Sequence, residues 1–261
     1  MKLHSNIIGE TGTPFLILHG LFGSGDNWKT LAKRFHQEKG LQVHLIDQRN
    51  HGRSPHSPIW TYEAMTADLK EYCEAHGLAE IVLLGHSMGG KTAMNFAIQY
   101  PELVKALVVV DIAPKSYPPH HDQILKGLDA LYGEELTSRK EADEELSQYV
   151  ESWSVRQFLL KNLYWKEKGK LAFRMNFPVI KKNYNLVTQA LPQTAKFDGP
   201  TLFIKGEKSN YILERDREVL RDHFSQSKLL IIKDSDHWVH AEKPVEFFEG
   251  VVAFLEEQKA I

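Results

Sequence analysis

The stretch GHSMGG (residues 85–90) directly follows the apolar run IVLL (residues 81–84). This order predicts a buried strand that turns sharply into a helix, with Ser87 at the apex of the turn. Such a turn needs small residues two positions before and two positions after the serine, and Gly85 and Gly89 stand there. We therefore expect the turn to present the Ser87 hydroxyl as a nucleophile, and a glycine-rich turn with an incidental serine is the weaker interpretation.

Other short apolar runs alternate with helical patterns along the chain. This order predicts an α/β fold with a mostly parallel central sheet and helices on both faces. Most of the runs are continuous, as in strands that are covered on both faces. They are residues 15–18, 43–46, 107–110, 201–204 and 229–232.

The connection between residues 110 and 201 is far longer than an ordinary connection in an α/β fold. Its apolar residues follow helical spacing, for example at Leu128 and Leu131. We therefore predict that residues 114–197, here called the insertion, form a helical cap placed after the strand that ends at Asp111. Residues 1–113 and 198–261 then form the core, and a separate domain, which would need two crossovers, is the less favoured alternative.

The composition limits which classes of protein this chain can belong to. The 261 residues are 42% hydrophobic and carry a formal net charge of −2, which gives no sign of a nucleic-acid or membrane partner. Cys73 is the single cysteine, so no disulfide forms within the chain. With no signal-like or membrane-spanning segment, we expect a cytoplasmic protein, either a monomer or a homodimer.

A serine nucleophile needs a base, and the chain has 13 histidines. His237 follows the last predicted strand, at the edge where open α/β sheets carry their sites, and His240 is the reserve. His86 should point away from Ser87. His120 and His121 open the insertion, and we expect them to be solvated.

The acid that orients the base is a choice between carboxylates. Asp111 ends an apolar strand, where a carboxylate needs a partner, although a local turn is an alternative role for it. Glu207 is the second candidate for the acid, because folds of this kind often have their acid just after the strand at residues 201–204. Ser209 occupies the position where that acid is expected. Asp47 ends another strand, but turn-forming neighbours and Arg49 within pairing reach favour a structural role.

The loop HGLFG (residues 19–23) follows the first clear strand, and its glycines allow close approach to a ligand. We expect the N–H groups of Leu21 and Met88 to hold the oxyanion.

With these residues assembled, the chain resembles the α/β-hydrolase superfamily and, within it, the bacterial YbfF-type esterases. The resemblance implies Ser87 as nucleophile, His237 as base, Asp111 as acid and Ser209 as a fourth member of the hydrogen-bonded set. Asp236 departs from the family's usual glycine and is a competing carboxylate. The matching stretches are HGLFGS (19–24), DQRNHGRS (47–54), GHSMGGK (85–91), DIAP (111–114), RMNFPV (174–179) and HWVHAEKP (237–244).

Substrate-binding residues are expected from the insertion and from the loops beside the serine, and we name Phe22, Arg174, Asn176 and Trp238. The insertion is rich in aromatic residues, of which one or two should wall an apolar acyl pocket. Residues 156–182 carry eight basic side chains against Glu167 alone. A solvated surface is the simpler interpretation of this basic stripe, and recognition of an acyl-coenzyme A thioester is the sharper one.

The sequence thus predicts a serine carboxylic-ester hydrolase that needs no metal or other cofactor and acts on small to medium acyl esters, with acyl-CoA thioesters as a further possibility. A C–C bond hydrolase or cofactor-free perhydrolase on the same scaffold is one alternative. A ligand-binding protein without activity is the other.

Overall fold

The structure, a computed structural model, describes residues 1–261. Its main body is a seven-stranded sheet in the order β1-β3-β2-β4-β5-β8-β9. β1 is antiparallel to β3, and every other neighbouring pair is parallel. The strands are β1 (Ser5–Ile8), β2 (Pro14–Leu18), β3 (Gln42–Ile46), β4 (Ile81–His86), β5 (Val104–Val110), β8 (Thr201–Gly206) and β9 (Ser227–Ile232).

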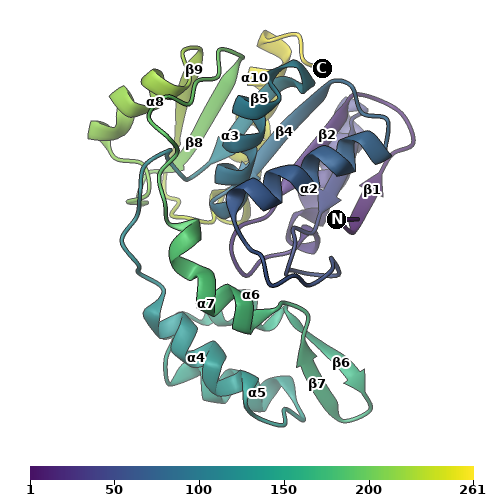
Figure 1. Cartoon of the computed structure of the whole chain (residues 1–261), viewed down its shortest axis with the longest axis vertical. Helices are drawn as coiled ribbons and strands as arrows, with labels where there is room; N and C mark the ends of the chain where they lie inside the picture. Colours follow the sequence, from purple (N-terminus) through teal and green to yellow (C-terminus); the bar gives the residue numbers. More distant parts are fainter.

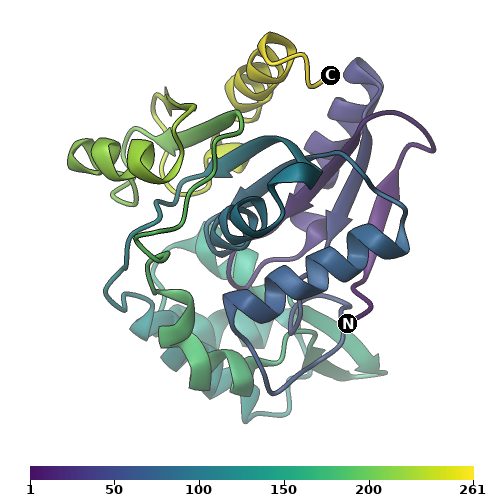
Figure 2. The ribbon, with the colours of Figure 1, turned by 45° about the horizontal axis from the view of Figure 1, so that its top comes forward.

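Helices cover both faces of this sheet (Figure 1). One face carries α2 (Tyr62–Ala75), α3 (Met88–Gln99) and α8 (Arg217–His223), and Figure 2 shows α3 between the other two. The opposite face carries α1 (Lys29–Lys39) and α10 (Pro244–Glu257). The short elements are η1 (Gly25–Trp28), η2 (Pro101–Leu103), η3 (Glu214–Asp216) and α9 (Val239–Glu242). None of the helices combines the length and the apolar character needed to span a bilayer.

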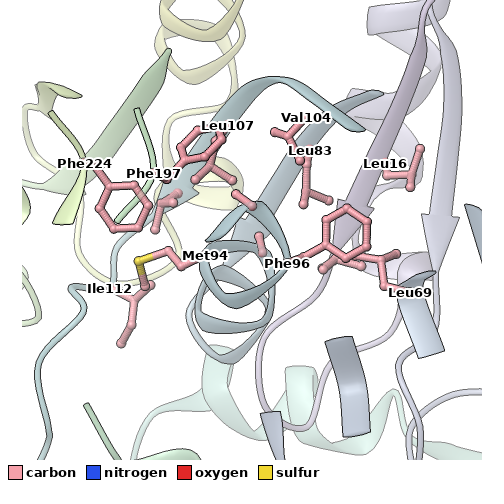
Figure 3. Close-up of a cluster of buried hydrophobic side chains, with 14 of the residues drawn as sticks. Leu16, Leu69, Leu83, Met94, Phe96, Val104, Leu107, Ile112, Phe197 and Phe224 are labelled. Carbon is pink, nitrogen blue, oxygen red and sulfur yellow. The ribbon is translucent and has the colours of Figure 1, made fainter. Parts of the chain in front are cut away.

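The core between the sheet and α3 explains why the strands are continuously apolar. Leu83 of β4 and Leu107 of β5 are fully buried, and Met94 and Phe96 of α3 pack in the same cluster (Figure 3). Alternate residues of the same strands face α1 and α10 on the other side, so both faces of each central strand are apolar. This packing fixes β4, and with it the turn that follows it.

The insertion forms a layer of its own beside the sheet (Figure 1). It consists of α4 (Asp122–Tyr132), α5 (Arg139–Ser147), α6 (Trp153–Leu160), β6 (Leu163–Glu167), β7 (Lys170–Phe173) and α7 (Phe177–Val187). Its buried residues share one cluster with Phe22, Trp60 and Met88 of the sheet-bearing part. Asn162 Nδ2 also donates a hydrogen bond of 2.7 Å to the backbone oxygen of Phe22. The insertion therefore packs onto the loops at the carboxyl ends of the strands.

The predicted α/β fold, with its mostly parallel sheet, is confirmed, and all six predicted strands are present. Two elements differ from the prediction. The edge strand β1 was not expected, because it is short and only partly buried. The insertion is not wholly helical, since β6 and β7 form an antiparallel hairpin that turns at Gly169, where φ is +79°.

Candidate active site

Ser87 occupies a strained turn between β4 and α3. Its backbone has φ +53° and ψ −118°, a conformation that residues other than glycine rarely adopt. A Cβ on Gly85 would lie 2.2 Å from the oxygen of Gly89, and a Cβ on Gly89 would lie 2.5 Å from the oxygen of His19. Only glycine fits at both positions, so the two glycines permit the turn that lifts Ser87 out of the sheet.

A chain of hydrogen bonds joins Ser87, His237 and Asp111. His237 Nδ1 lies 2.8 Å from Asp111 Oδ2, and His237 Nε2 lies 3.1 Å from Ser87 Oγ. A carboxylate can only accept hydrogen bonds, so Nδ1 of His237 carries the proton. Nε2 then accepts a hydrogen bond from the Ser87 hydroxyl. This tautomer is the one in which the imidazole can take the proton of Ser87.

Asp111 follows β5 directly, is fully buried and has φ +50°. The hydroxyl of Ser209 donates to Asp111 Oδ2, and the N–H of Gly206 donates to Oδ1 at 3.2 Å. With His237 the carboxylate thus accepts from three donors, which offsets the cost of burying it. Ser209 in turn accepts from the N–H of Tyr211 at 3.2 Å.

Burial shifts the pKa of both partners of this pair. Burial lowers the pKa of His237 to about 3, so the imidazole is neutral in the resting protein and free to accept a proton. Burial raises the pKa of Asp111, and the hydrogen bond from Ser209 works in the opposite direction by favouring the carboxylate.

The other carboxylates considered from the sequence lie apart from this chain of hydrogen bonds. Glu207 is exposed and accepts from the N–H of Asp234, and Asp236 is also exposed. Asp47 accepts from the N–H of Arg53 in its own turn and from the N–H of Gly25 in η1. The pairing of Arg49 with Asp47 that the sequence suggested is not formed.

The guanidinium of Arg49 binds the carboxylate of Asp68, through two hydrogen bonds of 2.6 and 2.8 Å.

The remaining histidines have different surroundings from those of His237. His86 Nε2 donates to the backbone oxygen of His237 at 2.9 Å, which steadies the loop that carries the base. His240 is buried and stacks on Trp28, with ring centroids 3.9 Å apart, whereas the side-chain hydrogen bond of Ser87 goes to His237.

Three residues near the base have contacts that the sequence did not indicate. Tyr211 stacks on the imidazole of His237, with ring centroids 3.9 Å apart and planes at 15°. His120 is exposed as expected, but it hydrogen-bonds the hydroxyl of Tyr211. The expectation that His121 is solvated is wrong, since it is partly buried and lies 2.6 Å from the hydroxyl of Tyr184. The sequence offered only a weak signal here, the position of Tyr211 two residues after Ser209.

The two N–H groups expected to hold the oxyanion belong to residues that line a cavity at Ser87. The N–H of Leu21 has no acceptor in the structure, and Met88 opens α3, where the first N–H groups of a helix lack intrahelical partners. The Leu21 loop approaches closely because Gly20 has no side chain, since a Cβ there would lie 3.3 Å from Cβ of Ser87.

Two cavities meet at Ser87. The first, the tyrosine cavity, has a volume of about 370 Å³, part of it open to solvent, and is lined by Tyr62, Tyr117, Tyr184 and Tyr211 among others. The second, the tryptophan cavity, has a volume of about 350 Å³, also partly open to solvent, and is lined by Phe22, Phe158, His237 and Trp238 among others. Phe22 and Trp238 therefore lie where the sequence interpretation expected them.

Arg174 and Asn176 line neither cavity, so the cavities give no support to their expected role in binding substrate. The guanidinium of Arg174 lies 4.4 Å above the ring of Tyr164. The side chain of Asn176 donates to Asn50 Oδ1 at 3.1 Å, and its N–H donates to the Asn50 oxygen at 2.8 Å. Asn176 therefore attaches the insertion to the loop after β3.

Three of the eight basic residues in the stripe of residues 156–182 pair with carboxylates. Arg156 binds Asp143 at 2.8 Å, and Lys181 binds Asp129 at 2.7 Å. Lys170 also lies near Glu167, and none of the eight basic residues lines either cavity at Ser87. A solvated, partly paired surface is therefore the interpretation that the geometry favours.

The chain and its fold match a known class of proteins. The family model described as "alpha/beta hydrolase fold" matches residues 13–244, and the chain belongs to this family. Among curated relatives, the mouse (Mus musculus) "sn-1-specific diacylglycerol lipase ABHD11" is 39% identical, with the match covering 98% of this chain and 85% of the mouse protein. The "Esterase YbfF" of Escherichia coli strain K12 is 33% identical, over 94% of each chain.

A solved structure, "Marine microorganism esterase", is 40% identical and superimposes with a TM-score of 0.93, covering 97% of this chain and 99% of that one. The predicted superfamily and the predicted enzyme class are thus confirmed at the level of an esterase- or lipase-type hydrolase.

Proposed function

We propose that this protein is a serine carboxylic-ester hydrolase that works through an acyl-enzyme on Ser87. The observation that carries the proposal is that one imidazole, His237, is within hydrogen-bond distance of both the Ser87 hydroxyl and the Asp111 carboxylate. A hydroxyl is a weak nucleophile until a positioned base takes its proton, and this arrangement supplies that base.

In the first half of the reaction, His237 Nε2 takes the Ser87 proton while Oγ bonds to the acyl carbon. The carbonyl oxygen becomes an oxyanion, for which the N–H groups of Leu21 and Met88 are the proposed donors. When the C–O bond to the alcohol breaks, Nε2 gives its proton to the departing oxygen. The acyl group remains on Ser87 and the free alcohol leaves.

In the second half, water replaces the alcohol. His237 takes a proton from the water while the hydroxyl oxygen bonds to the acyl carbon, and it then returns that proton to Ser87 Oγ as the acyl–oxygen bond breaks. In both halves, Asp111 stabilises the imidazolium and holds its orientation. Ser209 and the Gly206 N–H hold Asp111 in place through their hydrogen bonds.

The insertion is proposed to act as a cap over Ser87. It contributes Ile124, Val155 and Phe158 to the tryptophan cavity and Tyr184 to the tyrosine cavity. Both cavities are lined mainly by hydrophobic residues, which suits small to medium acyl esters. The relatives named as an esterase and as a diacylglycerol lipase support an ester substrate.

Acyl thioesters remain a second class of substrate to be tested. The basic stripe gives little support to phosphate binding at Ser87, because none of its eight basic residues lines either cavity. We therefore expect charge reversal at Lys168 and Lys170 to slow cleavage of an acyl-CoA and of a neutral ester equally.

The test of the proposal is hydrolysis of p-nitrophenyl butyrate together with labelling by a fluorophosphonate probe. We expect the wild-type protein to do both and Ser87→Ala to do neither, with the melting temperature of the variant close to that of the wild type. Wild-type protein that is neither labelled nor active would favour a ligand-binding role. Labelling without ester cleavage would favour C–C bond hydrolysis or perhydrolysis on the same scaffold.

A further inference from the structure

The two cavities at Ser87 offer separate places for the two sides of an ester. Ser87, Leu21 and His121 line both cavities, so the cavities meet at the serine. The ester carbonyl must lie at this junction, because its carbon has to reach Ser87 Oγ and its oxygen has to reach the Leu21 N–H. The acyl chain and the alcohol then extend in different directions from it.

The placement of His237 decides which side goes where. His237 lines the tryptophan cavity and not the tyrosine cavity. Tyr211, which lines the tyrosine cavity, covers a face of the imidazole at a centroid distance of 3.9 Å. Since His237 Nε2 must give its proton to the alcohol oxygen as the C–O bond breaks, that oxygen has to lie on the side of the tryptophan cavity.

We infer that the alcohol side of the ester occupies the tryptophan cavity and that the acyl chain occupies the tyrosine cavity. This inference rests on the proposed ester hydrolysis at Ser87 and deepens it. Thr188 and Val187 then border the acyl chain, and Phe158 and Trp238 border the alcohol.

The tryptophan cavity continues into a further space. Phe158 and Trp238, with ring centroids 5.7 Å apart, line both the tryptophan cavity and a third space of about 830 Å³, here called the outer cavity. Trp153, whose side chain is 66% exposed, lines the outer cavity as well. A long apolar alcohol can therefore continue past the two rings into the outer cavity, where these rings and Trp153 form the aromatic part of an otherwise mostly polar lining.

The tyrosine cavity is bounded by side chains that are fixed by hydrogen bonds. The Tyr62 hydroxyl donates to the oxygen of Val187 at 2.7 Å, and the Tyr184 hydroxyl lies 2.6 Å from His121 Nδ1. The substrate class that follows is esters of short to medium acids with longer, apolar alcohols.

Two series of neutral esters test which cavity holds the alcohol and which holds the acyl chain. Hydrolysis is measured by titrating the released acid at constant pH. One series consists of acetates of straight-chain alcohols of increasing length, and the other of ethyl esters of acids of increasing length. We expect wild-type kcat/KM to persist to longer chains in the alcohol series than in the acid series.

Two variants at partly buried positions test the two cavities separately. Phe158→Trp narrows the passage to the outer cavity and should lower kcat/KM for long-chain acetates about 10-fold while sparing the acid series. Thr188→Phe narrows the tyrosine cavity and should lower kcat/KM for long-chain acids by about the same factor while sparing the alcohol series.

Ser154→Trp, at an exposed residue of the outer cavity, repeats the first test if Phe158→Trp does not fold. The inference is overturned if the variants act on the opposite series, if each acts equally on both, or if the wild type tolerates longer acids than alcohols. In each of these results esters are still cleaved and the proposed function stands. Absence of cleavage and of fluorophosphonate labelling would instead remove the proposed function itself.

Discussion

His237 Nδ1 lies 2.8 Å from Asp111 Oδ2, although 126 positions separate the two residues in the chain. Asp111 follows β5 and His237 follows β9, and the carboxyl ends of these parallel strands meet at one edge of the sheet. The acid of the proposed triad therefore precedes the insertion, and the base follows the last strand.

Replacing Asp111 by Asn should remove most of the activity. The amide of Asn cannot stabilise the imidazolium that forms on His237, and it permits the wrong tautomer, so we expect kcat to fall by about 10⁴. Steady-state kinetics on p-nitrophenyl butyrate measure this. The matched variants Glu207→Gln and Asp236→Asn should stay close to wild type, and a large loss in either of them with an active Asp111→Asn would move the acid role.

Tyr211 should support the base through its ring. An aromatic face stabilises a stacked cation by about 0.5–2 kcal/mol, and His237 becomes a cation during the reaction. We therefore expect Tyr211→Leu to lower kcat about 10-fold and Tyr211→Phe, which keeps the ring, to restore most of it. Equal losses in the two variants, at matched melting temperatures, would show that the hydroxyl or the packing matters instead of the stack.

Gly85→Ala should destabilise the protein, because its Cβ would lie 2.2 Å from the Gly89 oxygen. Overpacking against backbone costs about 1–3 kcal/mol, and urea unfolding followed by circular dichroism measures it. Gly133→Ala is the matched control, since nothing lies nearer than 4.0 Å to its added Cβ. Unchanged stability in Gly85→Ala would contradict the close approach of β4 and α3.

Lys91 on α3 should make stability depend on pH. Its side chain is 1% exposed, and Nζ donates to the backbone oxygens of Lys115, at 2.7 Å, and Gln189. These two residues belong to the segments that enter and leave the insertion. Burial lowers the pKa of Lys91 from 10.5 to about 7, and the nearby charge of Lys115 adds to the effect.

Between pH 7 and 10.5 the unfolded chain therefore binds more protons at Lys91 than the folded protein does, so stability rises with pH across this window. We expect the unfolding free energy of the wild type, measured relative to Lys91→Met, to be larger at about pH 9.5 than at pH 7. A difference that stays constant or shrinks would mean that Lys91 remains charged throughout.

Much of the fold could be predicted from the sequence because its central strands are buried on both faces. Residues 81–84 and 107–110 are continuous apolar runs for that reason. The edge strand at residues 5–8 and the hairpin at residues 163–173 could not be predicted in this way. Both are partly exposed, and Lys166, Glu167 and Lys170 leave no clear alternation in the hairpin.

At the candidate site, sequence reasoning reached the residues whose place follows from a strand end. Ser87, Asp111 and His237 each follow a strand, so their common edge could be inferred from topology. Arg174 and Asn176 were misplaced because the packing of the insertion, on which their direction depends, leaves no periodic signal. Tyr211 was missed for the same kind of reason, since a stacking contact is set by loop geometry alone.

The measurement that tests the central claim most directly is mass spectrometry of the protein quenched during turnover of p-nitrophenyl butyrate. The account predicts a mass increase of one butyryl group, located by peptide mapping on Ser87 and absent from Ser87→Ala. Undiminished turnover by Ser87→Ala, or a butyryl group found on another residue of an active enzyme, would contradict it.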